Sequence, residues 1–272
     1  MSKLVLITLP IGNSEDITKR ALETLKEENH FLAEDTRNLS KLLNHYGIDS
    51  KSKNIDSFHD HSEDKIARIV DKIKRGQRLC IVSDAGSPVI SDPAFPLIRV
   101  CLQEGVKIEA NSGISAVTCA LELSGLPPHP FHFHGFLPKD SKGRREYFTE
   151  QLSQVGTHIF FESPYRMEES LEILAGVHPQ GDVAVGRELT KTYETVHRFK
   201  ASEFKNENIN YKGEFVLLFY VGKEHVPTKA ENQKLKDLAN QYLREKRSTK
   251  NLSKLLAEIL EEKSSDIYNE LI

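Results

Sequence analysis

The sequence has few cysteines and no long hydrophobic segment. The three cysteines, Cys80, Cys101 and Cys119, are odd in number and lack the spacing of metal ligands. We expect reduced thiols in the interior of the protein, as is usual in the cytoplasm. The longest apolar run, Phe215 to Val221, is too short to cross a bilayer, and no secretory leader follows Met1. These absences predict a cytoplasmic protein that is neither secreted nor embedded in a membrane.

A strong charge of one sign is also missing. The 272 residues include 37 Lys and Arg against 40 Asp and Glu, which gives a formal net charge of -3. Binding of nucleic acid through a global positive field is therefore excluded, and any contact with nucleic acid must come from local basic clusters. With 38% hydrophobic residues, the chain can bury one large core or two modest ones.

The first half of the chain alternates short apolar runs with amphipathic segments. Strands are predicted at Leu4 to Leu9, Phe31 to Ala33 and Leu79 to Ser83, and helices from about Asp16 and near Glu63 to Arg75. In the second of these helices the apolar residues recur every three or four positions, at Ile66, Ile69, Val70 and Ile73. This β/α alternation predicts an α/β lobe with a mainly parallel sheet.

The segment Gly125-Leu-Pro-Pro-His-Pro130 interrupts this alternation, because its prolines fit neither a helix nor a central strand. Strands with fewer helices between them follow, which predicts a second α/β lobe with a mixed sheet. They are expected at Phe131 to Leu137, His158 to Glu162, Asp182 to Glu188, Glu194 to Phe199 and Glu214 to Val221. The expected division is an N-terminal lobe over residues 1–124, a C-terminal lobe over 125–225 and a helical tail over 226–272.

Ligands of open parallel sheets bind beyond the carboxyl ends of the strands, so the loops at those ends are the first candidates for a site. In the loop that begins at Pro10, Asn13 or Ser14 is placed to cap a helix whose first turn holds Glu15 and Asp16. This acidic turn would repel a phosphate, and the loop lacks the later glycines of a dinucleotide fingerprint. The pattern favours a cofactor without phosphate.

Three further loops carry small or charged residues. Ala33-Glu-Asp-Thr-Arg37 places two carboxylates beside a guanidinium, a pattern that equally suits a surface ion pair or a helix cap. Val82 to Pro93 holds Asp84 among small residues that let the backbone approach a ligand, although a structural turn explains them too. Asn111 to Ala116 could be only the capped start of a helix.

Taken together, these segments resemble the ribosomal RNA branch of the tetrapyrrole (corrin/porphyrin) methylase superfamily. The match runs in order along nearly the whole chain. It is carried by Pro10-Ile-Gly-Asn, Asp16-Ile-Thr, Ala33-Glu-Asp-Thr-Arg, Ser83-Asp-Ala-Gly-Ser-Pro, Ser91-Asp-Pro, Gly135-Phe-Leu-Pro, Phe161-Glu-Ser-Pro-Tyr-Arg, Arg187-Glu-Leu-Thr-Lys and Lys212-Gly-Glu. The resemblance implies two α/β lobes with S-adenosylmethionine in the cleft between them, and a homodimer.

The implied activity is 2'-O-methylation of a cytidine in the 16S RNA of the small (30S) ribosomal subunit. The resemblance also implies that the donor pocket is lined by Pro10, Asp84, Gly86, Ser87, Ser115, Ala116, Phe161, Glu162 and Leu189. Methyl transfer from a sulfonium mainly requires alignment, but a base that takes the ribose proton would help. Asp35 is the first candidate for this catalytic role, with Glu34 or Lys191 as alternatives.

Two segments depart from the family pattern. Ser112-Gly-Ile-Ser-Ala116 lacks two prolines that the family usually has, and Ala94 stands where a glycine is usual, so the loop is expected to be less rigid.

His59-Asp-His-Ser-Glu63 invites interpretation as a metal site, but histidines and acids at strand ends are commonly only hydrogen-bonded or solvated. No metal is expected.

Candidate RNA contacts are local clusters of basic residues. Lys139 to Arg145 is predicted to be a loop with four basic residues, Lys139, Lys142, Arg144 and Arg145, against one acid, although it could be only a solvated surface. Arg37 and Arg166 are further candidates. The tail has seven basic and two acidic residues between Lys234 and Lys254, and its end resembles a helix-turn-helix with the turn at Lys263 to Ser265.

Two other functions remain open from the residues alone. The chain could methylate a tetrapyrrole or another small acceptor, as other branches of the superfamily do. It could also be a non-catalytic RNA-binding assembly protein that has lost its donor site, although the segments at Asp84 and Ser115 argue against this.

Overall fold

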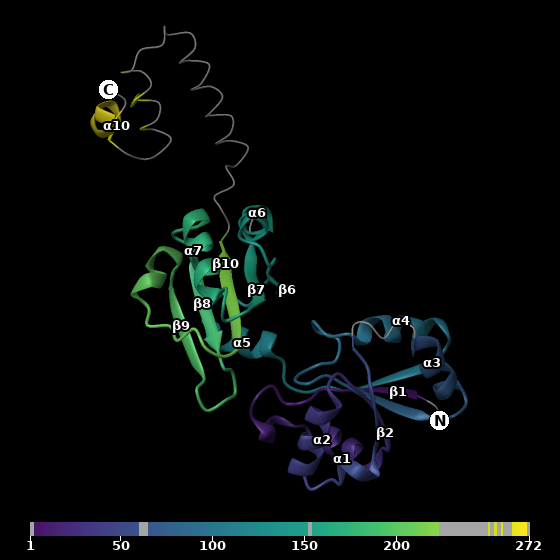
Figure 1. The fold of residues 1–272 in the computed structure, drawn as a ribbon. Coiled ribbons are helices and arrows are strands. Elements are labelled where there is room, and N and C mark those ends of the chain that lie inside the picture. Colours follow the sequence, from purple (N-terminus) through teal and green to yellow (C-terminus); the bar gives the residue numbers. More distant parts are fainter. Residues whose placement is uncertain are drawn as a thin grey trace. The chain divides into compact units, whose positions relative to one another are not determined.

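The computed structural model describes residues 3–59, 65–151, 154–222, 250, 253–254, 257 and 263–270. The chain forms two compact units, Met1–Gly222 and Lys223–Ile272. Figure 1 labels their helices and strands. Among the described residues, no helix is long and apolar enough to cross a membrane.

The first sheet of the larger unit consists of five parallel strands. They are β1 (Lys3–Ile7), β2 (His30–Ala33), β3 (Asn54–Ser57), β4 (Arg78–Val82) and β5 (Lys107–Asn111). Their order across the sheet is β3-β2-β4-β1-β5. Every neighbouring pair is parallel, which confirms the prediction of a mainly parallel N-terminal lobe.

Two pairs of helices cover opposite faces of this sheet, as Figure 1 shows. On one face α1 (Lys19–Glu27) and α2 (Thr36–His45) pack on a core that includes Val5 and Ile7 of β1. On the other face α3 (Ile66–Lys74) and α4 (Ala94–Gln103) pack on a core that includes Leu4. Alternate residues of a strand therefore enter different cores, as the period of two requires.

The helices of this lobe agree with the sequence patterns except at one start. All four apolar residues of the predicted stripe on α3 are buried: Ile66, Ile69, Val70 and Ile73. Asn13, however, caps only the short helix η1 (Ser14–Asp16), where its side chain accepts the N–H of Glu15 at 3.0 Å. The backbone of Ile17 and Thr18 is extended, so α1 begins at Lys19, later than predicted, with Thr18 as its cap.

The second sheet of the larger unit is mixed. Its strands are β6 (Phe131–Phe136), β7 (Gly156–Glu162), β8 (Asp182–Arg187), β9 (Thr195–Lys200) and β10 (Phe215–Val221), in the order β6-β7-β10-β8-β9. The pair β6 and β7 is parallel, and the other neighbours are antiparallel. The prediction of a mixed C-terminal sheet is confirmed.

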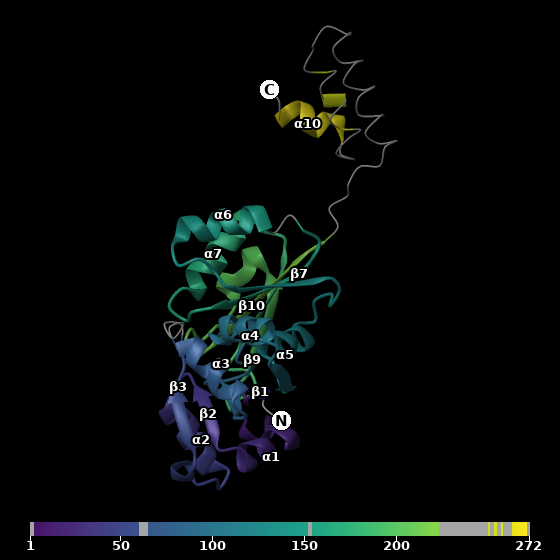
Figure 2. The ribbon, with the colours of Figure 1, turned by 90° about the vertical axis from the view of Figure 1, so that its right-hand side faces the viewer.

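Helices cover both faces of the second sheet as well. The helices α6 (Ser141–Gln151) and α7 (Met167–Val177) lie side by side, as Figure 2 shows, and with the short helix η4 (Ala201–Asn206) they cover its larger core. The opposite face is covered by α5 (Ala116–Ser124), which packs against β8 and β10.

The position of α5 bears on the expected lobe boundary. Val117 and Ala120 of α5 belong to the same apolar cluster as Leu218 of β10, so this helix packs with the C-terminal sheet. Residues 116–124 were assigned to the N-terminal lobe because the proline-rich segment after them breaks the β/α alternation. Because α5 packs on the second sheet, we propose that the lobes divide before Ser115, the residue that caps α5.

Little of the smaller unit is described. Its helix α10 (Ser264–Glu270) begins within the predicted turn, and the hydroxyl of Ser253 lies 3.3 Å from that of Ser264. The leucines expected to form a small core in the tail lie outside the described residues: Leu238, Leu243, Leu252, Leu255 and Leu256. Most of the basic segment Lys234 to Lys254 also lies outside them, so the helix-turn-helix stays a prediction.

The cysteines lie where reduced thiols were expected. Cys80 and Cys101 are buried, Cys119 is half-buried, and all three are free. Burial raises the pKa of the Cys80 thiol to about 12 and that of Cys101 to about 11. These thiols therefore stay protonated and serve as packing groups.

Candidate active site

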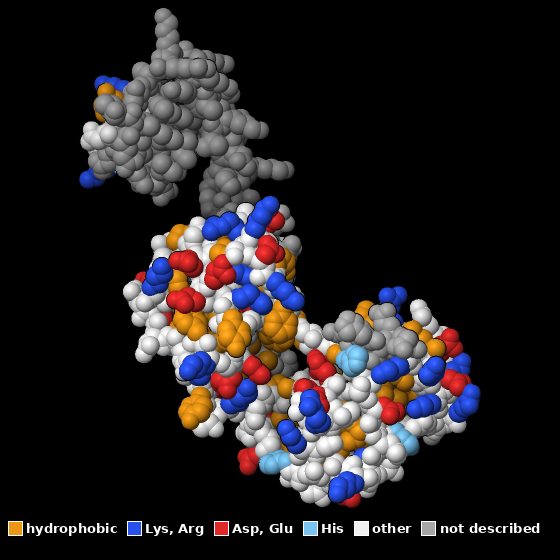
Figure 3. All heavy atoms as spheres, viewed as in Figure 1, with side chains coloured by type: hydrophobic (Ala, Val, Ile, Leu, Met, Phe, Trp, Pro, Cys, Tyr) orange, Lys and Arg blue, Asp and Glu red, His pale blue; other side chains and the backbone are white. Residues whose placement is uncertain are grey.

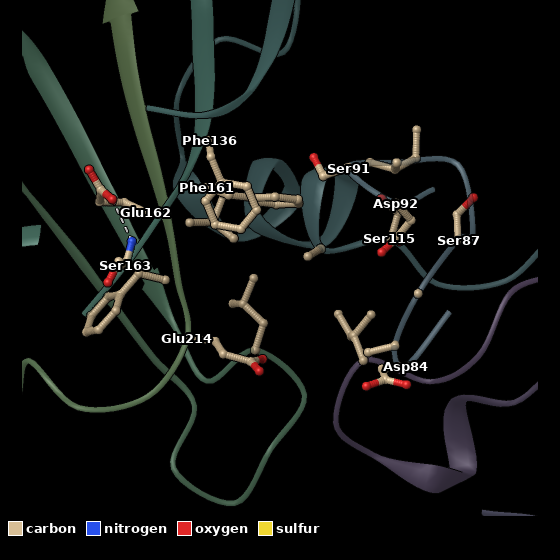
Figure 4. A pocket seen from close by; sticks show the side chains of 18 of the residues that line it. Asp84, Ser87, Ser91, Asp92, Ser115, Phe136, Phe161, Glu162, Ser163 and Glu214 are labelled. Atoms are coloured by element: carbon tan, nitrogen blue, oxygen red, sulfur yellow. Dashed lines mark hydrogen bonds between the residues drawn. The ribbon is translucent and has the colours of Figure 1, made fainter. Parts of the chain in front are cut away.

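The loops at the carboxyl ends of the strands meet around a cavity of about 510 Å³. From the N-terminal sheet it is lined by Ile11, Glu34, Asp84, Ala85, Gly86, Ser87, Ile90, Ser91 and Asp92. Ser115 and Ala116 at the start of α5 and elements of the second sheet complete it, with Phe136, Phe161, Glu162, Ser163, Pro164, Leu189, Gly213, Glu214, Phe215 and Val216. Figure 4 shows Asp84, Ser87 and Ser115 across the cavity from Phe161 and Glu214.

Acidic and apolar side chains dominate this cavity. Glu34, Asp84, Asp92 and Glu214 contribute carboxylates, and aromatic and aliphatic groups form much of the remaining wall. Within the described part of the chain, no Lys, Arg or His lines it. Such a wall attracts a cationic ligand with an apolar portion and disfavours a phosphate.

Hydrogen bonds fix the loop after β4, which holds Gly86, and the segment before α5, which ends at Ser115. Leu9 and Gly86 exchange backbone bonds, from Leu9 N–H to the Gly86 carbonyl at 2.9 Å and back at 3.1 Å. Gly86 has a φ of +69°, which a side chain would strain. Ser115 caps α5 by accepting the N–H of Val117. Ser91 also has a positive φ, 64°, and strained backbone of this kind is common at functional sites.

Asp84 joins the loop after β4 to the loop after β2. One carboxylate oxygen accepts the backbone N–H of Asp35 at 3.1 Å, and the other accepts the side-chain amide of Asn38 at 2.8 Å. Asp84 therefore holds the start of α2, and with it the neighbouring Glu34, at the cavity wall.

Glu162 lines the cavity, and its carboxylate is bonded within the protein. Its carboxylate is fully buried and accepts bonds from Ser163 N–H at 2.6 Å, the guanidinium of Arg166 and the Ser170 hydroxyl at 2.7 Å. These partners already engage both oxygens. Glu162 therefore shapes the backbone of the Ser163-Pro164 turn that lines the cavity.

Asp35 and Lys191, two of the three candidate bases, do not line the cavity, whereas Glu34 does. The Arg37 guanidinium binds Asp35 through two bonds, at 3.0 and 2.6 Å, and lowers the pKa of that carboxyl to about 2. Partial burial opposes the charge of Lys191, but bonds to Glu214 and Glu188 outweigh it and raise the pKa of the amine. Both shifts weaken these groups as bases at neutral pH.

The loop after β1 touches the loop after β8 beside the cavity. A side-chain carbon on Gly12 would lie 2.4 Å from Cγ of Lys191, so only glycine fits. The N–H of Asn13 donates to the Thr190 hydroxyl at 3.0 Å. Lys191 therefore serves as a packing and ion-pairing group at this contact.

The chain matches the family model described as tetrapyrrole (corrin/porphyrin) methylases over residues 3–205. The chain belongs to this family. Proteins named ribosomal RNA small subunit methyltransferase I are similar to this methylase. That of Vibrio cholerae serotype O1 is 38% identical, over 97% of this chain and 92% of its own length. The Thermotoga maritima protein is 42% identical, over 75% of this chain and 90% of its own length.

Solved structures support the methylase fold. The methyltransferase CobJ is similar with a TM-score of 0.61 and 15% identity, over 81% of this chain and 95% of its own. A diphthine synthase is similar with a TM-score of 0.61 and 13% identity, over 81% and 90%. At these identities the likeness shows the fold alone.

Eight of the nine residues expected to line the donor pocket of this methylase do line the cavity. Pro10, the exception, lines a smaller neighbouring cavity together with Asp84. Asp92, Phe136, Gly213 and Glu214 line the main cavity but were not among the expected contacts. They lie in or beside segments that carry the family resemblance, yet nothing in the sequence shows which way these side chains point.

The basic segment of this methylase is helical, contrary to the prediction of a loop, because Ser141 to Arg145 form the start of α6. Lys139, Lys142 and Arg145 are exposed, as RNA contact requires, and so is Arg37. Arg144 differs from them, because its side chain is fully buried and bound to Glu169 and to the carbonyls of Pro138 and Lys139, so it is not exposed to a ligand. Arg166 is held by Glu162.

No group of metal-binding side chains occurs among the described residues. The suggested cluster of residues 59–63 lies outside them except for His59. Its interpretation stays a prediction.

Proposed function

We propose that this methylase transfers a methyl group from S-adenosylmethionine to the small-subunit ribosomal RNA, with the 2'-hydroxyl of a cytidine as acceptor. One observation carries the proposal: a large cavity with acidic and apolar walls lies where the strand ends of a methylase fold meet. Relatives 38% to 42% identical bear the name of a small-subunit RNA methyltransferase.

The cavity fits the donor by charge and by shape. S-adenosylmethionine supplies, when bound, a methyl group already activated on a positively charged sulfonium. Asp84 and Asp92 offer negative charge to the sulfonium and to the amino group, whereas the carboxylate of Glu214 is bound to Lys191. Leu189 and the Phe161 ring provide apolar surface, and small residues at Gly86 and Ser115 leave room for close backbone contact.

Glu34 is the favoured proton acceptor among the three candidates. It lines the cavity at the end of β2, whereas Asp35 and Lys191 do not line it. Asp35 then acts by position, since its N–H bond to Asp84 holds the loop that carries Glu34. A carboxylate beside the acceptor hydroxyl takes its proton as the oxygen bonds to the methyl carbon.

RNA contact is assigned to the exposed cations Arg37, Lys139, Lys142 and Arg145 and to the basic tail. On the face that Figure 3 shows, Lys and Arg are interspersed with Asp and Glu. Affinity for RNA must therefore come from such local groups, and it should fall steeply with salt.

The two alternative functions have less support. Tetrapyrrole enzymes and diphthine synthases are similar only at 13% to 18% identity, far below the relatives named for ribosomal RNA. The non-catalytic alternative requires a lost donor site, yet the expected pocket residues still surround a cavity.

We also propose that the protein acts in the cytoplasm as a homodimer. Its proposed substrate is a ribosomal RNA, and ribosomes are cytoplasmic. Phe95 and Leu102 on α4 are 55% and 61% exposed and lie two helical turns apart, with the guanidinium of Arg99 over the Phe95 ring between them. We propose that a second copy of the chain covers these two side chains, and light scattering in solution should give twice the mass of 30.9 kDa.

The experiment that tests the function uses the purified full chain, small subunits that lack the modification and methyl-labelled S-adenosylmethionine. Label should enter the small-subunit RNA, at a ribose 2'-oxygen, and large-subunit RNA should stay unlabelled. Absence of transfer to small subunits at every assembly stage would contradict the proposal.

A further inference from the structure

A second cavity of about 330 Å³ lies beside the donor cavity. We call it the α2 hollow; it is lined by Leu9, Pro10, Ser14, Asn38, Leu39, Lys41, Leu42, His45, Ser83 and Asp84. Asp84 lines both cavities, so the two are neighbours. The volume is at the small end of the range for ligand sites, which suits one nucleotide.

Hydrogen bonds tie the walls of the α2 hollow together. The Tyr46 hydroxyl donates to the Ser14 carbonyl at 2.7 Å, which joins η1 to the end of α2. The amide of Asn38 binds Asp84 at 2.8 Å, and Leu9 is paired with Gly86. The hollow is therefore formed before a ligand arrives, which reduces the entropy lost on binding.

The lining combines an apolar surface with a basic rim. Pro10 and Leu42, which are half-buried, provide apolar area for a packed base, while Leu9 and Leu39 beneath them are buried in the core of the lobe. Lys41 and His45, one helical turn apart on α2, are exposed. A free phosphate would use the rim alone, whereas a nucleotide would use both parts.

The position of these charges matters because RNA must approach a cavity that is lined by several carboxylates. Glu34 and Asp84 at the end of the N-terminal sheet would repel its phosphates. The charge of Arg37 is largely compensated by Asp35, to which it is bound. Lys41, on the same helix as Arg37, supplies positive charge at the α2 hollow, beside the cavity wall that holds Glu34 and Asp84.

We propose that the α2 hollow binds the nucleotide next to the acceptor, with the base against Pro10 and Leu42 and the phosphate at Lys41. The inference rests on the proposed function, since it assumes RNA as the substrate. It adds a binding site on the N-terminal lobe to the contacts already assigned to α6 and the tail. His45 can donate a further bond to the phosphate.

The test compares Lys41→Glu and Lys41→Ala with Arg68→Ala as a matched control, because Arg68 is an exposed cation on α3, which covers the opposite face of the same sheet. The probe is a single-stranded RNA of small-subunit sequence, measured by fluorescence anisotropy across a salt series. Lys41→Ala should weaken binding about tenfold and lower the salt slope by about 0.7, the value for one phosphate contact. The control and the binding of S-adenosylmethionine should be unchanged.

A cross-linking measurement locates the nucleotide. A 4-thiouridine placed next to the acceptor cytidine should cross-link to peptides containing Ser14 or residues 38–45. Parent affinity and parent salt slope in Lys41→Glu would overturn the proposal, and so would cross-links confined to α6 or the tail. Failure of the parent protein to methylate RNA would instead contradict the proposed function, so the two failures are distinguishable.

Discussion

The carboxylate of Asp84 accepts the backbone N–H of Asp35 at 3.1 Å, which links the ends of β4 and β2. These residues are far apart in the sequence, and β2 and β4 are neighbours in the sheet. Because Asp84 also lines both cavities, one side chain connects the donor pocket, the loop carrying Glu34 and the α2 hollow.

Replacement of Asp84 by alanine should therefore affect several properties together. Asp84→Ala removes two hydrogen bonds and one carboxylate from the cavity wall, so the donor should bind more weakly and kcat should fall on the order of 10²-fold. Calorimetry with S-adenosylmethionine and single-turnover transfer measure the two effects. A variant with parent donor affinity and parent rate would show that this link is not needed.

The roles of Glu34 and Asp35 can be separated by isosteric substitutions. Glu34→Gln should lower kcat by about 10² to 10⁴, the usual contribution of a general base, with donor affinity nearly unchanged. Asp35→Asn should lower it less than about tenfold, because the low pKa of Asp35 makes it a weak base. The reverse order of effects would return Asp35 to the role of proton acceptor.

Two neighbouring arginines of α6 should behave differently. Arg144→Ala removes a fully buried guanidinium that binds Glu169 and two carbonyls, so unfolding free energy should fall by about 2 kcal/mol. Arg145→Ala should leave stability unchanged and reduce the salt dependence of RNA binding. Urea melts and anisotropy measure these outcomes; equal effects of the two variants on RNA affinity, with both folded, would contradict the burial of Arg144.

A histidine chain in the second sheet predicts a pH dependence of stability. The Gln154 carbonyl accepts from His158, whose other ring nitrogen then accepts from His134, which in turn accepts from the Tyr147 hydroxyl. This arrangement keeps both histidines neutral. Burial, with His158 and His132 nearby, lowers the pKa of His134 from 6.5 to about 4.

The sign of the effect follows from the lowered pKa. Between pH 6.5 and about 4 the unfolded chain binds more protons at His134 than the folded chain. The contribution of neutral His134 to the free energy of unfolding should therefore be fully present above pH 6.5 and be lost as the pH falls through this range. As the pH falls, the melting temperature of His134→Phe should decline less steeply than that of the parent. The melting temperature of His45→Gln, a change at an exposed position, should follow that of the parent. Parallel curves for all three proteins would refute this assignment.

Much of the fold was predictable because the spacing of apolar residues along the sequence indicates which side chains are buried. The stripe of Ile66 to Ile73 and the apolar runs of the strands follow directly from the two cores of each sheet. The side of α5 was not predictable, since its residues are apolar around much of the helix and fit either sheet. The start of α1 was missed because Asn13, Ser14 and Thr18 are all good caps, and only the extended backbone at Ile17 decides between them.

The site was predictable at the level of loops but not of side-chain roles. Strand ends and small residues indicated the loops at Asp84 and Ser115. The burial of Arg144 was not predictable from the local charge pattern, because its partner Glu169 lies on another helix. The hydrogen bonds that Arg166 and Ser170 donate to Glu162 were likewise not predictable, because they depend on how α7 follows β7.

The central claim is tested most directly by mapping 2'-O-methyl groups on ribosomal RNA from cells with and without this protein. The account predicts that one cytidine of the small-subunit RNA loses its methyl group when the protein is absent. The methyl group should return when the parent protein is restored, but not when the Glu34→Gln variant is supplied. An identical methylation pattern with and without the protein would contradict the account.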